Sequence, residues 1–145
     1  MKIMAVDFGE ARTGLAVCDR TEFLASPVGV IQERDFETCV KKVAYAATKE
    51  LGVEMIVVGL PKNMDGTLGS RAELCQKFAK ALKALIPLPV ELWDERQTTM
   101  QATTYLNEIN VKGQKRKEII DEVAATIILE SYLQYRKNQK NQASN

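Results

Sequence analysis

The chain has 145 residues, of which 46% are hydrophobic and 27% charged, the composition of an ordinary soluble globular protein with a single domain. Its 20 basic and 19 acidic residues give a net charge of +1, so nucleic-acid binding would need a local patch rather than a global charge. The sequence contains no histidine, which excludes Ser-His and Cys-His nucleophiles, histidine bases and histidine metal ligands.

The first part of the chain predicts three strands, at residues 2–8, 13–19 and 23–32. Their short links favour antiparallel neighbours, and therefore a three-stranded meander. Pro27 and Gly29 in the third strand indicate an edge position or a bulge.

The rest of the chain alternates helices with strands. We expect helices over residues 35–51, 70–86, 98–109 and 119–136, and strands over residues 54–61 and 88–95. Asp35 is suited to cap the first helix and Gly52 to end it. The uninterrupted apolar run 55–58 is typical of a parallel strand covered on both faces. Residues 137–145 are polar and predict a disordered tail after one domain at 1–136.

This order of elements predicts the fold class. Right-handed crossovers would place all five strands in one mixed α/β sheet, with helices on both faces. Three antiparallel strands come first, and two more are added through helical crossovers. This is the layout of the ribonuclease H-like fold.

Cysteine usage and the opening residues bear on the compartment. Cys18, Cys39 and Cys75 are odd in number and lack close metal-ligand spacing, which indicates reduced thiols. The opening segment reaches Asp7 too soon for a signal peptide or a membrane span. We therefore expect a cytoplasmic protein.

Carboxylates stand at the ends of two predicted strands. Asp7 follows an apolar run, where an ionised carboxylate must be paired, hydrogen-bonded or bound to metal. A turn aspartate that accepts backbone N–H bonds is the alternative. Asp94 and Glu95 close the fifth strand, at the end where open α/β sheets usually place ligands. The alternative for these two is a helix cap or an ion pair with Arg96.

A third carboxylate lies on the last predicted helix. Asp121 shares a helix face with Ala124, Ala125 and Ile128, so we expect it to face the sheet, where small alanines allow a close approach. An aspartate favoured by the helix dipole is the alternative. Three such acids in a chain without histidine suit Mg²⁺ or Mn²⁺, and one or two of these ions would support phosphodiester hydrolysis.

The loop PKNMDGTLGSR, which follows a buried strand and opens a helix, has the features of a phosphate-binding loop. Gly66 and Gly69 would allow close backbone approach. The candidate phosphate ligands are Lys62, Thr67, Ser70 and Arg71 in this loop, with Arg12 and Arg96 beside the predicted acids. The alternatives are an ordinary capped loop, and arginines that only neutralise the carboxylates.

Four segments, DFGEARTGLAVCD, VVGLPKNMDGTLGSRAE, WDERQTT and DEVAATIILESYL, resemble the signature segments of the YqgF/RuvX family, in the same order and over about residues 3–133. The resemblance implies a ribonuclease H-fold nuclease of the bacterial cytoplasm. The family is described both as nucleases that process the 5′ end of pre-16S rRNA and as Holliday junction resolvases. It also implies that Asp7, Glu95 and Asp121 are the catalytic, metal-binding acids, although Asp94 stays open as the second acid.

Three further considerations bear on function. Better-known junction resolvases with this fold carry an acid near the end of the fourth strand, where this chain has Gly59, Leu60 and Pro61. This difference weakens any direct transfer of junction specificity to this chain. The family resemblance itself places rRNA precursor ahead of four-way DNA as the partner, and a resolvase cutting symmetrically would need a homodimer. DFGEARTG also resembles the phosphate hairpin of actin-like ATPases and sugar kinases, which need two such lobes. A non-catalytic RNA- or ribosome-binding module is the third alternative.

Overall fold

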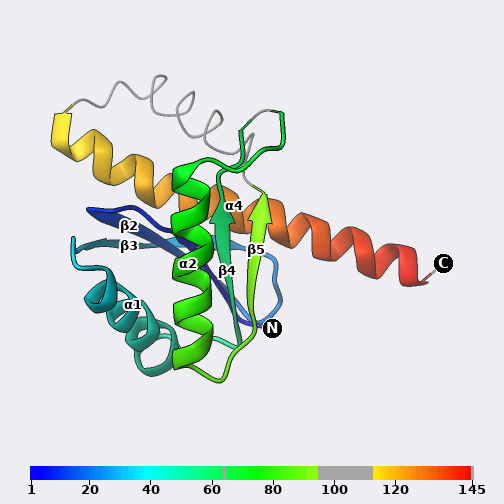
Figure 1. The fold of residues 1–145 in the computed structure, drawn as a ribbon. Helices are drawn as coiled ribbons and strands as arrows, with labels where there is room; N and C mark the ends of the chain where they lie inside the picture. The colour runs from blue at the N-terminus through cyan, green and yellow to red at the C-terminus, as the bar shows by residue number, and fades with distance from the viewer. Residues whose placement is uncertain (64, 95–112, 145) are drawn as a thin grey trace.

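The computed structural model describes residues 1–63, 65–94 and 113–144 (Figure 1). It contains one five-stranded sheet in the order β3-β2-β1-β4-β5. The strands are β1 (Ile3–Asp7), β2 (Arg12–Cys18), β3 (Ala25–Gln32), β4 (Met55–Leu60) and β5 (Val90–Asp94). The helices are α1 (Phe36–Tyr45), its π-helical continuation η1 (Ala46–Glu50), α2 (Ser70–Leu85) and α4 (Gly113–Ser144). The predicted helix at 98–109 lies outside the described residues.

The sheet has the predicted mixed topology. β1, β2 and β3 pair antiparallel as a meander, while β4 is parallel to β1 and β5 is parallel to β4. β3 is an edge strand, and its register places Leu15 opposite Gly29 and Ala16 opposite Pro27, which leaves Val28 as an extra residue. The predicted edge position and bulge are both confirmed, and they blunt this edge against further pairing.

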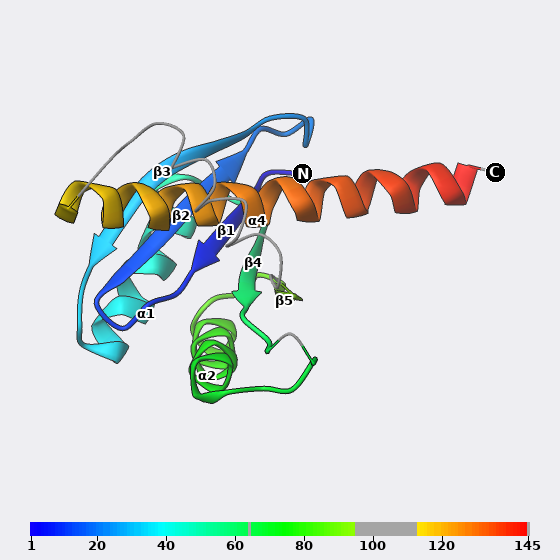
Figure 2. The same ribbon diagram turned by 90° about the horizontal axis from the view of Figure 1, so that it is seen from above.

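Alternating side chains build a hydrophobic core on each face of the sheet. Met4 and Val6 of β1 pack beneath α1 and α2, whereas Ile3 and Ala5 pack beneath α4. Figure 2 shows the sheet between α4 on one side and the other two helices on the opposite side. The predicted helices on both faces are therefore confirmed. The sheet face on which a strand residue lies shows which helices its side chain contacts.

The first helix begins and ends as its sequence predicts. The Asp35 side chain accepts the backbone N–H of Thr38 at 2.9 Å, which caps α1. Gly52 follows the helical segment with a φ of 60°, a left-handed conformation that favours glycine. The last turn before it, η1, is π-helical rather than α-helical.

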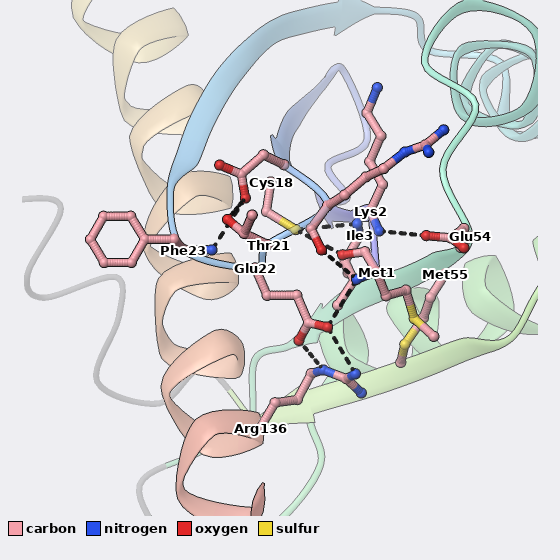
Figure 3. A network of polar contacts seen from close by, with 12 residues as sticks. Met1, Lys2, Ile3, Cys18, Thr21, Glu22, Phe23, Glu54, Met55 and Arg136 are labelled. Carbon is pink, nitrogen blue, oxygen red and sulfur yellow. Dashed lines mark hydrogen bonds and ion pairs between the residues drawn. The ribbon is translucent and has the colours of Figure 1, made fainter.

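The last helix is longer than the sequence predicts. It begins at Gly113 rather than near residue 119, and it continues through Ser144, where the sequence predicts a disordered tail from residue 137. Lysine and glutamine are good helix formers, and Gln134 donates to Asn138 at 3.0 Å on the next turn. A second reason is that Glu22, in the turn between β2 and β3, holds both sides of the predicted boundary: it binds Arg136, the last residue of the predicted helix (Figure 3), and lies 3.5 Å from Lys140 in the predicted tail.

The state of the three cysteines agrees with the expectation drawn from their number and spacing. Cys18, Cys39 and Cys75 are buried and free, as predicted for reduced thiols. Burial raises the pKa of the Cys18 and Cys39 thiols, which keeps them neutral.

Over the part of the chain that the structure describes, no helix has the length and hydrophobicity needed to cross a membrane.

Candidate active site

Asp7 lies at the carboxyl end of β1, with only 10% of its side chain exposed. It shares the sheet face of Ile3 and Ala5, the face that α4 covers. On β2, Asp7 pairs with Gly14. On β4, Val58 pairs with Val6, so the next residue, Gly59, lies beside Asp7. Both neighbouring strands thus place a residue without a side chain beside this carboxylate.

Arg71 connects the predicted phosphate loop to Asp7. The Arg71 Nη2 lies 3.4 Å from Asp7 Oδ1, although the two residues are 64 positions apart in the sequence. Arg71 is the second residue of α2, and Figure 1 shows the loop before it at the end of the sheet where β4 and β5 point. A predicted acid and a predicted phosphate ligand therefore meet at one end of the sheet.

Hydrogen bonds of Thr67 fix the conformation of the predicted phosphate loop. Its hydroxyl donates to Asp65 Oδ1 at 2.7 Å and accepts from Asn63 Nδ2 at 3.0 Å. Gly66 between these residues has a φ of 89°, which only glycine adopts without strain. The Thr67 hydroxyl is thus already bonded within the loop, and its predicted contact with phosphate stays a prediction.

The remaining loop candidates lie around the start of α2. Ser70 is the first residue of this helix and is exposed, and Gly69 before it provides no side-chain cap. Lys62 is half-buried and turns tightly out of β4, since its backbone N–H donates to the carbonyl of Leu60 at 3.0 Å. Backbone donors at a helix start favour an anion, and Lys62 adds a positive charge to the loop before that helix.

The β1–β2 turn places Arg12 on the face of Asp7. Arg12 begins β2 and alternates with Gly14, the partner of Asp7. A Cβ on Gly9 would lie 2.3 Å from the Arg12 carbonyl oxygen, so this turn requires glycine. Thr13, which is fully buried, holds the turn through contacts of 3.4 Å between its hydroxyl and both the N–H and the carbonyl of Gly9. Nothing in the sequence singles out Thr13, because a threonine in a strand is ordinary.

The direction of Trp93 decides where Asp94 projects. The Trp93 indole N–H donates to Ser131 of α4 at 3.2 Å, so Trp93 lies on the α4 face, where it packs against the core. Asp94 is the next residue and pairs with Leu60, which packs beneath α1 and α2. Asp94 therefore belongs to the sheet face opposite that of Asp7.

Glu95 and Asp121 are the other two predicted acids. Glu95 and the neighbouring Arg96 lie outside the described residues, and the side chain of Asp121, which is in α4, lies outside the described side chains. Further along the helix face predicted for Asp121, Ala125 and Ile128 are fully buried against the sheet. The inward direction of that face is therefore confirmed for the residues that follow.

The chemistry of the described donors fits a hard divalent cation. Among the side chains that the structure describes, no group of three acids or cysteines could hold a metal ion, and two of the predicted ligands lie outside this set. Asp7 itself provides a carboxylate with little exposure, next to glycines, in a chain without histidine. Oxygen ligands of this kind suit Mg²⁺ or Mn²⁺.

The family model described as RuvX: Holliday junction resolvase matches residues 1–135. The chain belongs to the RuvX family. A RuvX relative from Listeria monocytogenes, named "Putative pre-16S rRNA nuclease", is 46% identical over 137 residues, which are 92% of this chain and 97% of the relative. Another with the same name, from Caldanaerobacter subterraneus, is 40% identical over 139 residues, covering 95% of this chain and 99% of the relative. The predicted family is confirmed.

Two solved structures with a similar fold are junction resolvases. The RuvC of Thermus thermophilus, solved in complex with a Holliday junction substrate, matches with a TM-score of 0.61 at 13% identity, over 95% of this chain and 96% of that chain. The fowlpox virus resolvase, solved with Holliday junction DNA, matches with a TM-score of 0.55 at 16% identity, over 93% of this chain and 98% of that chain. At these identities the likeness shows the fold, and the predicted ribonuclease H-like fold is confirmed.

Proposed function

We propose that this RuvX-family protein is a metal-dependent endonuclease of the cytoplasm that processes the 5′ end of pre-16S rRNA. The observation that carries the proposal is the contact of Asp7 with Arg71, because it joins an acid at the carboxyl end of the sheet to the loop suited to phosphate. The name shared by relatives that are 40% and 46% identical over almost their whole length supports rRNA precursor as the substrate.

Each predicted residue takes part through its own chemistry. Asp7, Glu95 and Asp121 would hold one or two Mg²⁺ or Mn²⁺ ions. Such an ion, when bound, activates water and stabilises the leaving oxygen. The residues that would bind the nucleic-acid backbone are Arg12, Lys62, Thr67, Ser70, Arg71 and Arg96. A guanidinium such as that of Arg71 offers a phosphate two parallel N–H donors, which fixes the position of the scissile bond as well as its charge.

Four-way DNA is the second candidate substrate. The description of the matching family model and the resolvases that share the fold both support it. Cutting a junction symmetrically requires two active sites, and therefore a homodimer of this chain. The two candidates differ in the nucleic acid and the oligomeric state, while the acids that would hold the metal ion are the same.

The proposal is tested by cleavage of two labelled substrates, the 5′ segment of a pre-16S rRNA and a four-way DNA junction. Each is incubated with the purified protein in Mg²⁺, in Mn²⁺ and in excess chelator. We expect cleavage of the RNA with either ion and none with chelator. Cleavage of the junction alone would select the second candidate. Binding without cleavage of either substrate would contradict the nuclease proposal and favour a non-catalytic RNA-binding module.

The same assay distinguishes the two acids at the end of β5. Because Asp94 lies on the face opposite Asp7, Asp94→Asn should leave the cleavage rate of folded protein within about threefold of wild type, as expected for a side chain that does not point toward Asp7. Glu95→Gln provides the contrasting variant, since the proposal makes Glu95 a metal ligand. A loss of cleavage in Asp94→Asn with normal activity in Glu95→Gln would reverse the assignment of the second acid.

A further inference from the structure

The contact between Asp7 and Arg71 joins two very different side chains. Asp7 is held at the end of a buried strand with 10% of its side chain exposed, whereas 62% of the Arg71 side chain is exposed. The distance of 3.4 Å is long for a charge-assisted hydrogen bond. Ion pairs with one partner in solvent are weak, so the guanidinium leaves this carboxylate at little cost while the carboxylate stays in place.

A divalent cation bound to Asp7 would compete with the guanidinium for the same oxygens. It carries more charge than Arg71, it binds the carboxylate directly, and it repels a guanidinium that remains a few ångströms away. Metal binding therefore favours the arrangement in which Arg71 has left Asp7. Because Arg71 is in the first turn of α2, its guanidinium then stays near the backbone donors of that turn.

We infer that Arg71 exchanges partners: it neutralises Asp7 in the metal-free protein and binds a phosphate of the nucleic acid once a divalent ion holds Asp7. The inference rests on the proposed function and adds an order of events to it. Metal binding releases a phosphate ligand, and a phosphate that holds Arg71 removes a competitor of the metal. Binding of the ion and binding of the nucleic acid are then positively coupled through this one side chain, and the coupling is reciprocal.

The exchange predicts opposite effects of one substitution on two affinities. In Arg71→Gln without nucleic acid, Mn²⁺ should bind about threefold tighter or more, because the competing cation is gone. In the cleavage assay at saturating RNA this difference in metal affinity should disappear, because a phosphate then holds the wild-type guanidinium away from Asp7. The KM of the variant for RNA should rise about tenfold through loss of a charged hydrogen-bond donor. Mn²⁺ binding is followed by the electron paramagnetic resonance signal of the free ion, which does not depend on cleavage.

Two further variants make the result specific. Lys80→Gln removes the same charge from an exposed position nine residues further along α2, and both affinities should stay at the wild-type values. Arg71→Lys keeps the charge but loses the fork of two donors, so its Mn²⁺ affinity should lie near wild type while its KM stays raised.

Unchanged or weaker Mn²⁺ binding in Arg71→Gln would overturn the exchange. If this variant bound both Mn²⁺ and RNA more weakly, the substitution would have caused a structural defect instead. Unchanged KM would also overturn it, since Arg71 would then bind no phosphate. If the wild-type protein binds no Mn²⁺ at all, the metal-dependent function fails together with the inference. Metal-dependent cleavage with unchanged Mn²⁺ affinity in Arg71→Gln would leave the function standing and reject the exchange alone.

Discussion

Asp7→Asn is expected to lower the rate of RNA cleavage by about a thousandfold or more, because the amide cannot supply the charge with which a carboxylate holds a divalent ion beside the scissile phosphate. The side chain keeps its size and one oxygen, so the sheet should fold around it as before. Its ion pair with the exposed Arg71 is of the kind worth about 1 kcal/mol or less, so the midpoint of thermal unfolding should change little. Initial rates in Mg²⁺ and a thermal melt measure the two effects.

Asp19→Asn is the matched control for this substitution. Asp19 is an exposed aspartate that follows β2, outside the predicted set of acids, and its variant should cleave at the wild-type rate. If Asp7→Asn retained more than about a tenth of the wild-type rate, a loss under about 1.4 kcal/mol in transition-state free energy, Asp7 would not be a metal ligand. The proposed active site would then be wrong even if the protein is a nuclease.

The fold could be predicted because the signals that set it are local. Apolar alternation and short links identify β1 to β3 as a meander, and the apolar run of β4 indicates a strand covered by helices on both faces. The choice of sheet face for Asp94 is also a local property. Once Trp93 is known to point toward α4, alternation alone sends Asp94 to the other side. The sequence left this choice open because a tryptophan at a strand end gives no direction by itself.

The contacts of the site depend on residues distant in sequence, and these could not be predicted. Both Asp7 and Arg71 are candidates from their own surroundings, but their contact depends on how α2 docks beside the end of β1. The bonds that occupy the Thr67 hydroxyl depend on the exact path of its loop. The helical conformation of the predicted tail has the same cause, since Lys140 lies 3.5 Å from Glu22, 118 positions earlier in the chain.

The carboxylate of Glu22, in the turn between β2 and β3, binds several cationic groups (Figure 3). Its carboxylate accepts from Arg136 Nε at 2.6 Å and Nη2 at 3.2 Å, and from the amino group of Met1 at 3.1 Å. Lys140 lies 3.5 Å away. Only 10% of the Glu22 side chain is exposed, and its φ of 61° is unusual for a residue other than glycine. The network therefore outweighs a local backbone cost and ties the end of α4 to the sheet.

Glu22→Gln should consequently lower the free energy of unfolding at pH 7 by about 2 kcal/mol, because a neutral amide leaves Arg136 without its charged partner. Hydrogen bonding from Arg136 lowers the pKa of Glu22 from 4.5 to about 2. A carboxyl group whose pKa is lower in the folded state stabilises the protein above its unfolded pKa. The wild-type protein should lose this stabilisation as the pH falls from about 4.5 toward about 2, and Glu22→Gln should not.

Urea unfolding of both proteins between pH 7 and pH 3 measures this difference, which should shrink steadily below pH 4.5. Glu33→Gln is the control, since the Glu33 carboxylate pairs at 2.8 Å with Lys42, whose side chain is 49% exposed, and loss of this pair should cost under about 0.5 kcal/mol. Its other bond, from the backbone N–H of Asp35 at 3.1 Å, can be kept by the amide oxygen of the glutamine. A constant difference between wild type and Glu22→Gln at every pH would contradict the assignment of the titrating group. Because α4 also carries Asp121, the network holds in place the helix that would bring this acid to the metal, and cleavage by Glu22→Gln should fall in step with its folded fraction.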